Sequence, residues 1–309
     1  MTLSEPLSGV MPIAPTIFAA DESLDLVGQR RAFDFLIDAG VDAICILANY
    51  SEQFALTDRE RDELQAIAFE QVAGRVPIIV TTSHYSSRIA AERSRAAEVS
   101  GADMVMVMPP YHGATLRAEP EAIRAYFATI ADAISIPIMV QDAPMSGTPL
   151  SAAFLADLAR EIPLVQYAKI ESAGAAAKLR ATIDLAGDSL PGPFDGEESI
   201  TLIPDLEAGA TGTMPSAMIP EVLGDVVRRW QAGDQDQATA LWEAWLPMIH
   251  YENRHCGLRA TKILMKEGGI IGSETTRAPF GPVPSQIRAG LVHHARRRKP
   301  LIVRWAHQL

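Results

Sequence analysis

The sequence predicts an α/β protein, a (β/α)8 TIM barrel followed by a C-terminal helical subdomain. Short apolar runs alternate with longer amphipathic runs from the start of the chain to about residue 225. Eight such repeats fit a closed barrel better than an open sheet, and no glycine-rich dinucleotide fingerprint follows the first apolar run. Beyond this point only helical patterns remain. We therefore expect a barrel domain at residues 1–225 and a helical subdomain at residues 226–309.

The predicted strands are short and apolar on both faces, as in parallel sheets that helices cover on both sides. They span residues 10–16, 43–47, 77–82, 104–108, 137–141, 165–170, 191–194 and 212–214. Turns with a glycine, such as Gly40, Gly101 and Gly209, stand before three of them. Glycine readily adopts the left-handed conformation that ends a helix, so these turns mark the passage from helix to strand.

The amphipathic runs predict a helix after each strand. In the barrel these helices span residues 27–39, 58–73, 86–99, 119–133, 152–162, 175–186 and 199–208. In the C-terminal part they span residues 224–232, 237–252, 258–267 and 284–297. The last two are separated by Gly268-Gly269 and by a turn rich in proline, which a helix does not tolerate.

Composition excludes several classes of function. The net charge of −11 disfavours a surface for nucleic acid or anionic membrane. Cys45 and Cys256 lie in no disulfide or zinc spacing, which suits a reducing cytoplasm. No signal peptide is apparent at the N-terminus, and no apolar run approaches the roughly 18 residues of a membrane span. We expect a cytoplasmic protein that binds a small molecule.

Lys169 is the strongest candidate for a chemical role. The chain has five lysines, and four of them lie in helical or terminal patterns typical of a surface. Lys169 instead lies within an apolar strand, where loss of hydration favours the neutral, nucleophilic amine. Strand alternation places Tyr167, Lys169 and Glu171 on one face, so Glu171 is either a general acid/base or only an ion-pair partner. A lysine extending from the strand end to solvent is the structural alternative.

Polar residues follow three other strands at the end where barrel enzymes carry their active sites. After the second strand, a loop of small and polar residues suits binding of an anion by backbone N–H groups, although plain turns have the same composition. Histidines and tyrosines follow the third and fourth strands, and a histidine there is often only a hydrogen-bonded structural group. We expect no metal site, because the histidines show no ligand spacing. The candidates are Asn49, Tyr50, Ser51, His84, Tyr111 and His112.

At these positions the sequence resembles the dihydrodipicolinate synthase/N-acetylneuraminate lyase family over essentially its whole length. The segments that carry the resemblance are the run at residues 48–52, the Met-Pro-Pro-Tyr run at residues 108–111, and Lys169. The resemblance implies that Lys169 forms an imine with a 2-keto acid and that the N–H groups of Asn49 and Tyr50 hold the carboxylate. It also implies a homo-oligomer, tetramer or dimer, and no cofactor.

Departures from the family pattern resemble its sugar-acid dehydratase branch. Gln141 replaces the family's catalytic tyrosine, and the run at residues 195–198 suggests that Asp195 and Gly196 contact the sugar-derived end, or that the acidic residues only cap a helix. The resemblance implies dehydration of L-2-keto-3-deoxyarabonate to 2-ketoglutaric semialdehyde. The proton donor for water loss stays open, and its candidates are Glu171, His84, Tyr111 and Tyr50.

Two alternatives remain. The first is an aldolase or a dehydratase that acts on another 2-keto-3-deoxy sugar acid through the same imine. The second is a sensor of keto acids that has lost turnover, which the presence of Lys169 on a buried strand disfavours.

Overall fold

Strands and helices alternate along the chain in the computed structural model, which describes residues 5–112 and 116–307. The chain divides into two compact units. The first consists of Met1–Ser8, Pro77–Glu197 and Thr201–Met214. The second consists of Gly9–Val76, Glu198–Ile200 and Pro215–Leu309.

The sheet of the first unit contains six strands. In spatial order they are β3 (Ile78–Thr81), β4 (Met104–Val107), β7 (Ile138–Asp142), β8 (Val165–Ile170), β9 (Gly192–Asp195) and β10 (Gly212–Thr213). Each pair of neighbours is parallel. Their side chains are almost all buried, as the apolar composition of both strand faces predicts.

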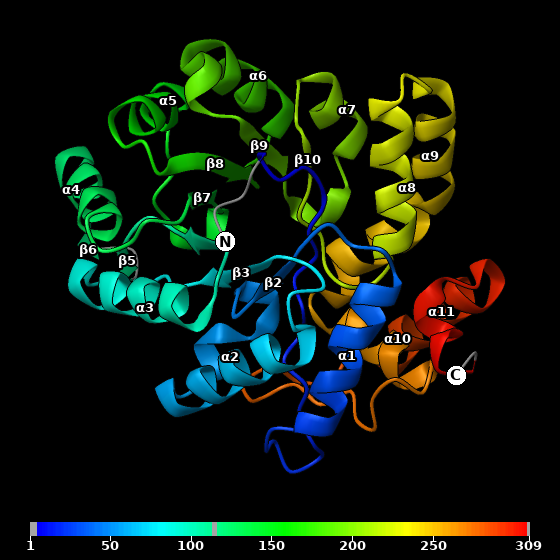
Figure 1. Ribbon diagram of the computed structural model, residues 1–309. Helices are drawn as coiled ribbons and strands as arrows, with labels where there is room; N and C mark the ends of the chain where they lie inside the picture. Colours follow the sequence, from blue (N-terminus) through cyan, green and yellow to red (C-terminus); the bar gives the residue numbers. More distant parts are fainter. Residues whose placement is uncertain (1–4, 113–115, 308–309) are drawn as a thin grey trace. The chain divides into compact units, whose positions relative to one another are not determined.

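Helices connect these strands and lie in an arc outside them, as Figure 1 shows for α4, α5 and α6. The helices of this unit are α3 (Ser87–Ser100), α4 (Pro120–Ala131), α5 (Ala152–Glu161), α6 (Ala175–Ala186) and α7 (Leu202–Glu207). Their ends follow local chemistry. Gly101 ends α3 with a φ of 106°, which favours glycine, and the Ser151 hydroxyl caps α5 by accepting from the N–H of Phe154.

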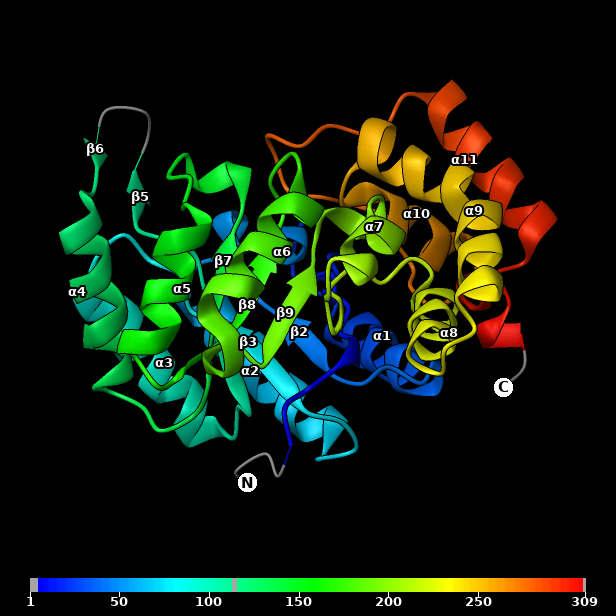
Figure 2. The same cartoon turned by 90° about the horizontal axis from the view of Figure 1, so that it is seen from above.

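The second unit contains two strands and six α-helices among its described residues. They are β1 (Gly9–Val10), β2 (Ile44–Ile46), α1 (Leu26–Asp38), α2 (Asp58–Val72), α8 (Pro220–Gln231), α9 (Gln235–Tyr251), α10 (Arg259–Glu267) and α11 (Ser285–Arg298). Helix α9 packs against α8 and α11, and α11 packs against α10 (Figure 2). A capping box of Thr57 and Glu60 starts α2.

Short helical turns complete the structure. The 3-10 turns are η1 (Asn49–Ser51), η2 (Gln53–Ala55), η3 (Pro144–Ser146), η4 (Gly187–Ser189), η5 (Glu197–Ser199), η7 (Leu301–Val303) and η8 (Trp305–His307). A π-helical turn, η6 (Glu252–Cys256), extends α9. Within residues 5–112 and 116–307, no helix is both long enough and apolar enough to cross a bilayer.

The structure has a strand in each of the eight predicted runs. The first run is the least regular: beyond β1 it holds only isolated pairings of Ile13 with Cys45 and Ser216. Pro12 and Pro15 flank Ile13 and cannot donate a backbone hydrogen bond, which explains why no continuous ladder forms.

A short antiparallel hairpin of β5 (Tyr111–His112) and β6 (Leu116–Arg117) was not predicted, because two-residue strands leave no periodic signal. The predicted domain boundary at residue 225 falls inside α8 and stays a prediction.

Replacement of Gly192 by alanine should destabilise the protein by about 1–3 kcal/mol through overpacking. A Cβ at this position would lie 1.9 Å from a ring carbon of Tyr167, whose ring lies on the neighbouring strand β8 and whose hydroxyl accepts from the N–H of Leu7. Urea unfolding measures the change. Gly272→Ala is the control, because a Cβ there meets nothing within 4 Å. Equal stabilities of the two variants would contradict the close packing of Tyr167 on Gly192.

Candidate active site

Lys169 is buried in strand β8, as predicted. Its side chain is only 5% exposed, and its Nζ lies 2.8 Å from Oε1 of Glu171. The two residues are two apart in an extended segment, so they lie on the same face of the sheet. The alternative of a lysine that reaches solvent is therefore wrong, whereas an ion pair with Glu171 is present.

Gln141 joins this pair from the neighbouring strand β7. It stands opposite Lys169 in the parallel register, and its Nε2 donates to Oε1 of Glu171 over 2.8 Å. Oε1 of Glu171 thus interacts with both Nζ of Lys169 and Nε2 of Gln141. The amide orientation leaves the buried Oε1 of Gln141 with no hydrogen-bond partner among the described residues. An unsatisfied buried acceptor costs about 1–3 kcal/mol, so a ligand or water that donates to it is favoured.

Gly196, predicted as a substrate-binding residue, lies directly against Lys169 and Glu171. A Cβ on Gly196 would stand 2.3 Å from Cγ of Glu171 and 3.2 Å from Cε of Lys169. Only a residue without a side chain fits there without displacing them. Bare backbone at the end of β9 therefore leaves room for the ion pair.

The alternate positions of the same strands bear a second, separate set of acidic groups. Asp142 pairs with Lys178 of α6 and accepts from the N–H of Leu150. Asp195 has no exposed surface and accepts from the hydroxyl of Thr213. The predicted contact of Asp195 with substrate stays a prediction.

Asp205 of α7 was missed by the sequence reasoning. It is fully buried and accepts from the hydroxyl of Thr201. Burial and the adjacent carboxyl group of Asp205 raise the pKa of Asp195 well above its usual range. Burial therefore favours the neutral, protonated form of Asp195 over the carboxylate.

The candidate residues that follow β3 and β4 differ in how free their side chains are to take part in catalysis. The Nδ1 of His84 accepts from the N–H of Ser86, and its carbonyl accepts from the hydroxyl of Tyr126, so His84 is held in a structural turn. Tyr111 is half-buried, and burial raises its pKa, which keeps its hydroxyl protonated. The side chain of His112 lies outside the part of the structure that is described.

The predicted anion-binding loop lies in the second unit as the turn η1. Its Ser51 is buried, and the hydroxyl is engaged with the loop itself: it donates to the carbonyl of Ala14 and accepts from the N–H of Ala48. The side chain of Asn49 accepts from Nε2 of Gln53 over 2.7 Å. These contacts fix the backbone of Asn49, Tyr50 and Ser51.

The sequence reasoning was wrong about Lys262, which it assigned to a surface. Its side chain is fully buried and pairs with the equally buried Glu52. Arg259, Lys262 and Lys266 form an i, i+3, i+7 stripe that normally indicates a solvated helix face. Because most of α10 is buried, this stripe was misleading.

Glu252 in η6 was also missed. Burial and the nearby charge of Glu198 raise the pKa of Glu252 to about 8, and Asn253 donates to Glu198 over 3.2 Å. A single isolated glutamate in an amphipathic helix gives no sequence signal for such burial.

The backbone around Glu198 is strained, because three successive residues, Glu197 to Ser199, have positive φ angles although all three carry side chains.

Comparison with known proteins places these features in a family. The model of the dihydrodipicolinate synthetase family matches residues 6–297. The chain is 55% identical over 299 residues to L-2-keto-3-deoxyarabonate dehydratase of Azospirillum brasilense, covering 97% of both proteins.

Solved structures agree. Dihydrodipicolinate synthase of Rhodopseudomonas palustris superposes with a TM-score of 0.85 at 27% identity, over 94% of this chain and 97% of that one. YagE of Escherichia coli K12, a family member solved in complex with pyruvate, superposes with a TM-score of 0.86 at 25% identity, over 95% and 99%. The predicted (β/α)8 barrel with a C-terminal helical region is thereby confirmed.

The raised pKa of Glu252 predicts a pH-dependent stability. Between about pH 4.5 and about pH 8 the folded protein keeps a proton on Glu252 that the unfolded chain releases, so the free energy of unfolding falls as pH rises through this window. Glu252→Gln removes this titration. Relative to the wild type, the variant should gain stability steadily from pH 5 to pH 8 in urea unfolding. The exposed Glu63→Gln is the control, and parallel pH profiles of wild type and Glu252→Gln would refute the assignment.

Proposed function

Because the chain belongs to the dihydrodipicolinate synthetase family, we propose that it is a Schiff-base lyase that dehydrates L-2-keto-3-deoxyarabonate to 2-ketoglutaric semialdehyde. The observation that carries this proposal is its full-length similarity to the dehydratase of that name. The buried Lys169, which shares Oε1 of Glu171 with the amide of Gln141, supplies matching chemistry.

In this proposal the amine of Lys169 attacks the C2 ketone and water leaves, which forms an iminium. Glu171 lies within hydrogen-bonding distance of Nζ and takes up the lysine proton as the free amine forms. The iminium withdraws electrons from C3, so a C3 proton is lost and an enamine results. Glu171 passes the lysine proton to the departing C2 oxygen, is again a carboxylate, and can then accept the C3 proton.

The enamine then expels the C4 hydroxyl, which leaves as water after it receives a proton. This leaves a C3=C4 double bond conjugated with the iminium. Loss of a C5 proton then gives a dienamine with an enol at C5, protonation at C4 and C3 turns the enol into the aldehyde and the enamine back into the iminium, and hydrolysis restores the C2 ketone and Lys169. The overall reaction removes one water molecule. Glu171 in its protonated form and the half-buried Tyr111 are the donors that we favour for the C4 oxygen.

Gln141 fits dehydration better than carbon–carbon cleavage. Its unpartnered Oε1 is an acceptor suited to a substrate hydroxyl at C4 or C5. Retro-aldol cleavage needs a base to remove the C4 hydroxyl proton, and an amide is not basic enough to act as one. We propose that Gln141 orients this hydroxyl and thereby suppresses cleavage.

The remaining site assignments are also proposals. The backbone N–H groups of Asn49 and Tyr50, with Ser51 holding the turn, bind the carboxylate, and His84, His112, Asp195 and Gly196 surround the substrate. We further propose a cytoplasmic homo-oligomer, a tetramer or a dimer, that acts on a small 2-keto acid without a cofactor. A second candidate function is an aldolase on another 2-keto-3-deoxy sugar acid, which the similarity to the pyruvate complex of YagE favours.

Incubation with L-2-keto-3-deoxyarabonate should yield the semialdehyde without pyruvate. Borohydride quenching and mass spectrometry should locate a substrate-sized adduct on Lys169. Lys169→Met should abolish both, whereas Lys266→Met, which alters a partly exposed lysine, should change neither. Pyruvate with glycolaldehyde would identify an aldolase. Absence of both product and adduct with this acid and a wider panel of keto acids would refute the proposal.

Replacing Gln141 by tyrosine should shift the products toward cleavage. The tyrosine hydroxyl can pass its own proton to Glu171 as it takes the C4 hydroxyl proton, which an amide cannot do, so pyruvate and glycolaldehyde should rise relative to the semialdehyde. Chromatography of both product sets gives the ratio. Gln166→Tyr, on the adjacent strand β8, is the control. An unchanged ratio in a folded Gln141→Tyr protein would show that Gln141 does not select the reaction.

A further inference from the structure

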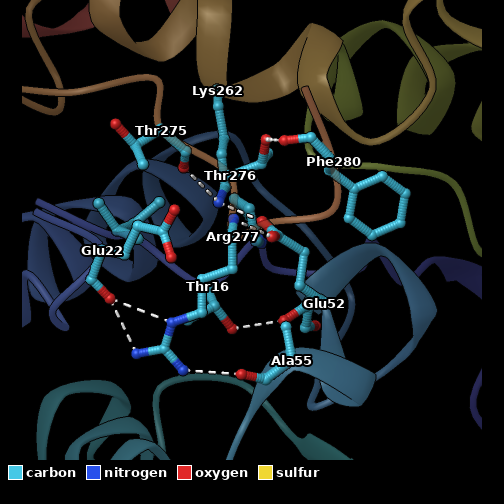
Figure 3. A network of polar contacts seen from close by, with 12 residues as sticks. Thr16, Glu22, Glu52, Ala55, Lys262, Thr275, Thr276, Arg277 and Phe280 are labelled. Carbon is cyan, nitrogen blue, oxygen red and sulfur yellow. Dashed lines mark hydrogen bonds and ion pairs between the residues drawn. The ribbon is translucent and has the colours of Figure 1, made fainter. Parts of the chain in front are cut away.

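Among the described residues of the second unit, a fully buried ion pair joins helix α10 to the loop after β2. Lys262 of α10 and Glu52, which directly follows η1, both have side chains with no exposed surface. The Nζ of Lys262 donates to Oε1 of Glu52 and, over 2.9 Å, to the carbonyl of Thr275 (Figure 3). Desolvation cancels much of the attraction in such a pair, so stability alone is a weak reason for its presence.

Arg277 completes the contact from the same C-terminal segment. Its backbone N–H donates to Oε2 of Glu52 over 3.0 Å, so both carboxylate oxygens are held. Its guanidinium donates to the carbonyl of Ala55 over 2.7 Å and pairs with Glu60 at the start of α2. Figure 3 shows Arg277 reaching from beside Glu52 to Ala55 and Glu22.

Phe18 lies under both cations of this cluster. The Nζ of Lys262 is 4.5 Å and the guanidinium carbon of Arg277 is 4.4 Å from the centre of its ring. Such distances permit cation–π attraction, which favours charged forms that burial would otherwise disfavour. Burial nevertheless lowers the pKa of Lys262 to about 8. Contacts with protein groups, not with solvent, therefore fix the positions of the Lys262 and Arg277 cations.

These contacts fix the direction of the loop backbone. Glu52 has a φ of 55°, in the left-handed region, and Leu47 on the other side of the loop has a φ of 58°. The carbonyl of Ser51 accepts from the hydroxyl of Thr16 over 2.6 Å. A change of φ at Glu52 would rotate the peptide groups of η1, and its side chain is held from α10 and from Arg277.

We propose that Glu52, Lys262 and Arg277 form a clamp that positions the N–H groups of Asn49 and Tyr50 for a carboxylate, and so makes the enzyme selective for 2-keto acids over simple ketones. This inference rests on the proposed function, because it assigns the carboxylate to η1. The three clamp residues are positioning residues. The C-terminal helical region thereby acts on substrate recognition through the loop backbone.

The test compares two ketones of similar size, pyruvate and acetone, of which only pyruvate has a carboxylate. The rate of borohydride-trapped adduct at Lys169 is measured for each. Glu52→Gln combined with Lys262→Met removes both buried charges together, which avoids an unpaired charge in the core. The pyruvate rate should fall roughly tenfold or more, as for the loss of one charge-assisted hydrogen bond, with an unchanged acetone rate. For the sugar acid, KM should rise with little change in kcat.

A second variant and a control complete the design. Arg277→Lys keeps the charge and the buried pair but loses the guanidinium contacts to Ala55 and Glu60. It should therefore lower the ratio of the pyruvate adduct rate to the acetone adduct rate, even if the double variant does not fold. Glu274→Gln with Arg288→Met removes a different ion pair of the C-terminal region and should leave the ratio unchanged.

The outcomes separate the two proposals. An equal fall in both adduct rates, or an unchanged ratio in folded variants, would overturn the clamp and leave the Schiff base intact. A wild type that traps acetone as fast as pyruvate would also overturn it. Absence of any adduct in the wild type would instead remove the proposed function, and with it the premise of the clamp.

Discussion

The arrangement of the candidate site depends on placing one primary amine inside a parallel sheet. A buried ammonium group is costly unless a charge partner stands beside it, and Glu171 provides this partner two residues further along the chain. The space for that carboxylate comes from Gly196, whose missing side chain leaves room for Cγ of Glu171. Gln141 then binds the same oxygen from β7 and fixes the carboxylate in place. The β7–β8 register, the bare backbone of Gly196 and the amide of Gln141 thus all support the pairing of Lys169 with Glu171.

The two buried lysines show how partners decide the role of a group. Lys262 is surrounded by Glu52, the carbonyl of Thr275 and the ring of Phe18, which together hold its ammonium in one position. Lys169 shares the Glu171 oxygen with an amide that has its own acceptor still open. The first environment suits a fixed structural charge. The second suits a proton transfer followed by a new bond to carbon, because the carboxylate can accept the proton that the amine loses.

Sequence reasoning succeeded where a physical periodicity exists. Strand alternation placed Lys169 and Glu171 together, and the apolar runs located every strand of the sheet. It failed where long-range packing overrides a local pattern. Lys262 lies in a charged stripe of α10 that looks solvated, although Glu52, 210 residues earlier, covers it. The pairing of Asp195 with Asp205 likewise depends on how α7 packs on β9, which no local pattern encodes.

A glutamine at position 141 has a consequence that a tyrosine would not have. The amide provides a donor and an acceptor at once, so it can hold Glu171 through Nε2 while Oε1 remains for a substrate hydroxyl. A phenol could also donate to Glu171 and accept from a substrate hydroxyl, but unlike an amide it can ionise and act as a base. Because an amide does not ionise at ordinary pH, the site can orient a hydroxyl strongly without removing its proton. In the proposed reaction, Gln141 on β7 is therefore the side chain that we expect to decide between loss of water and cleavage of a carbon–carbon bond.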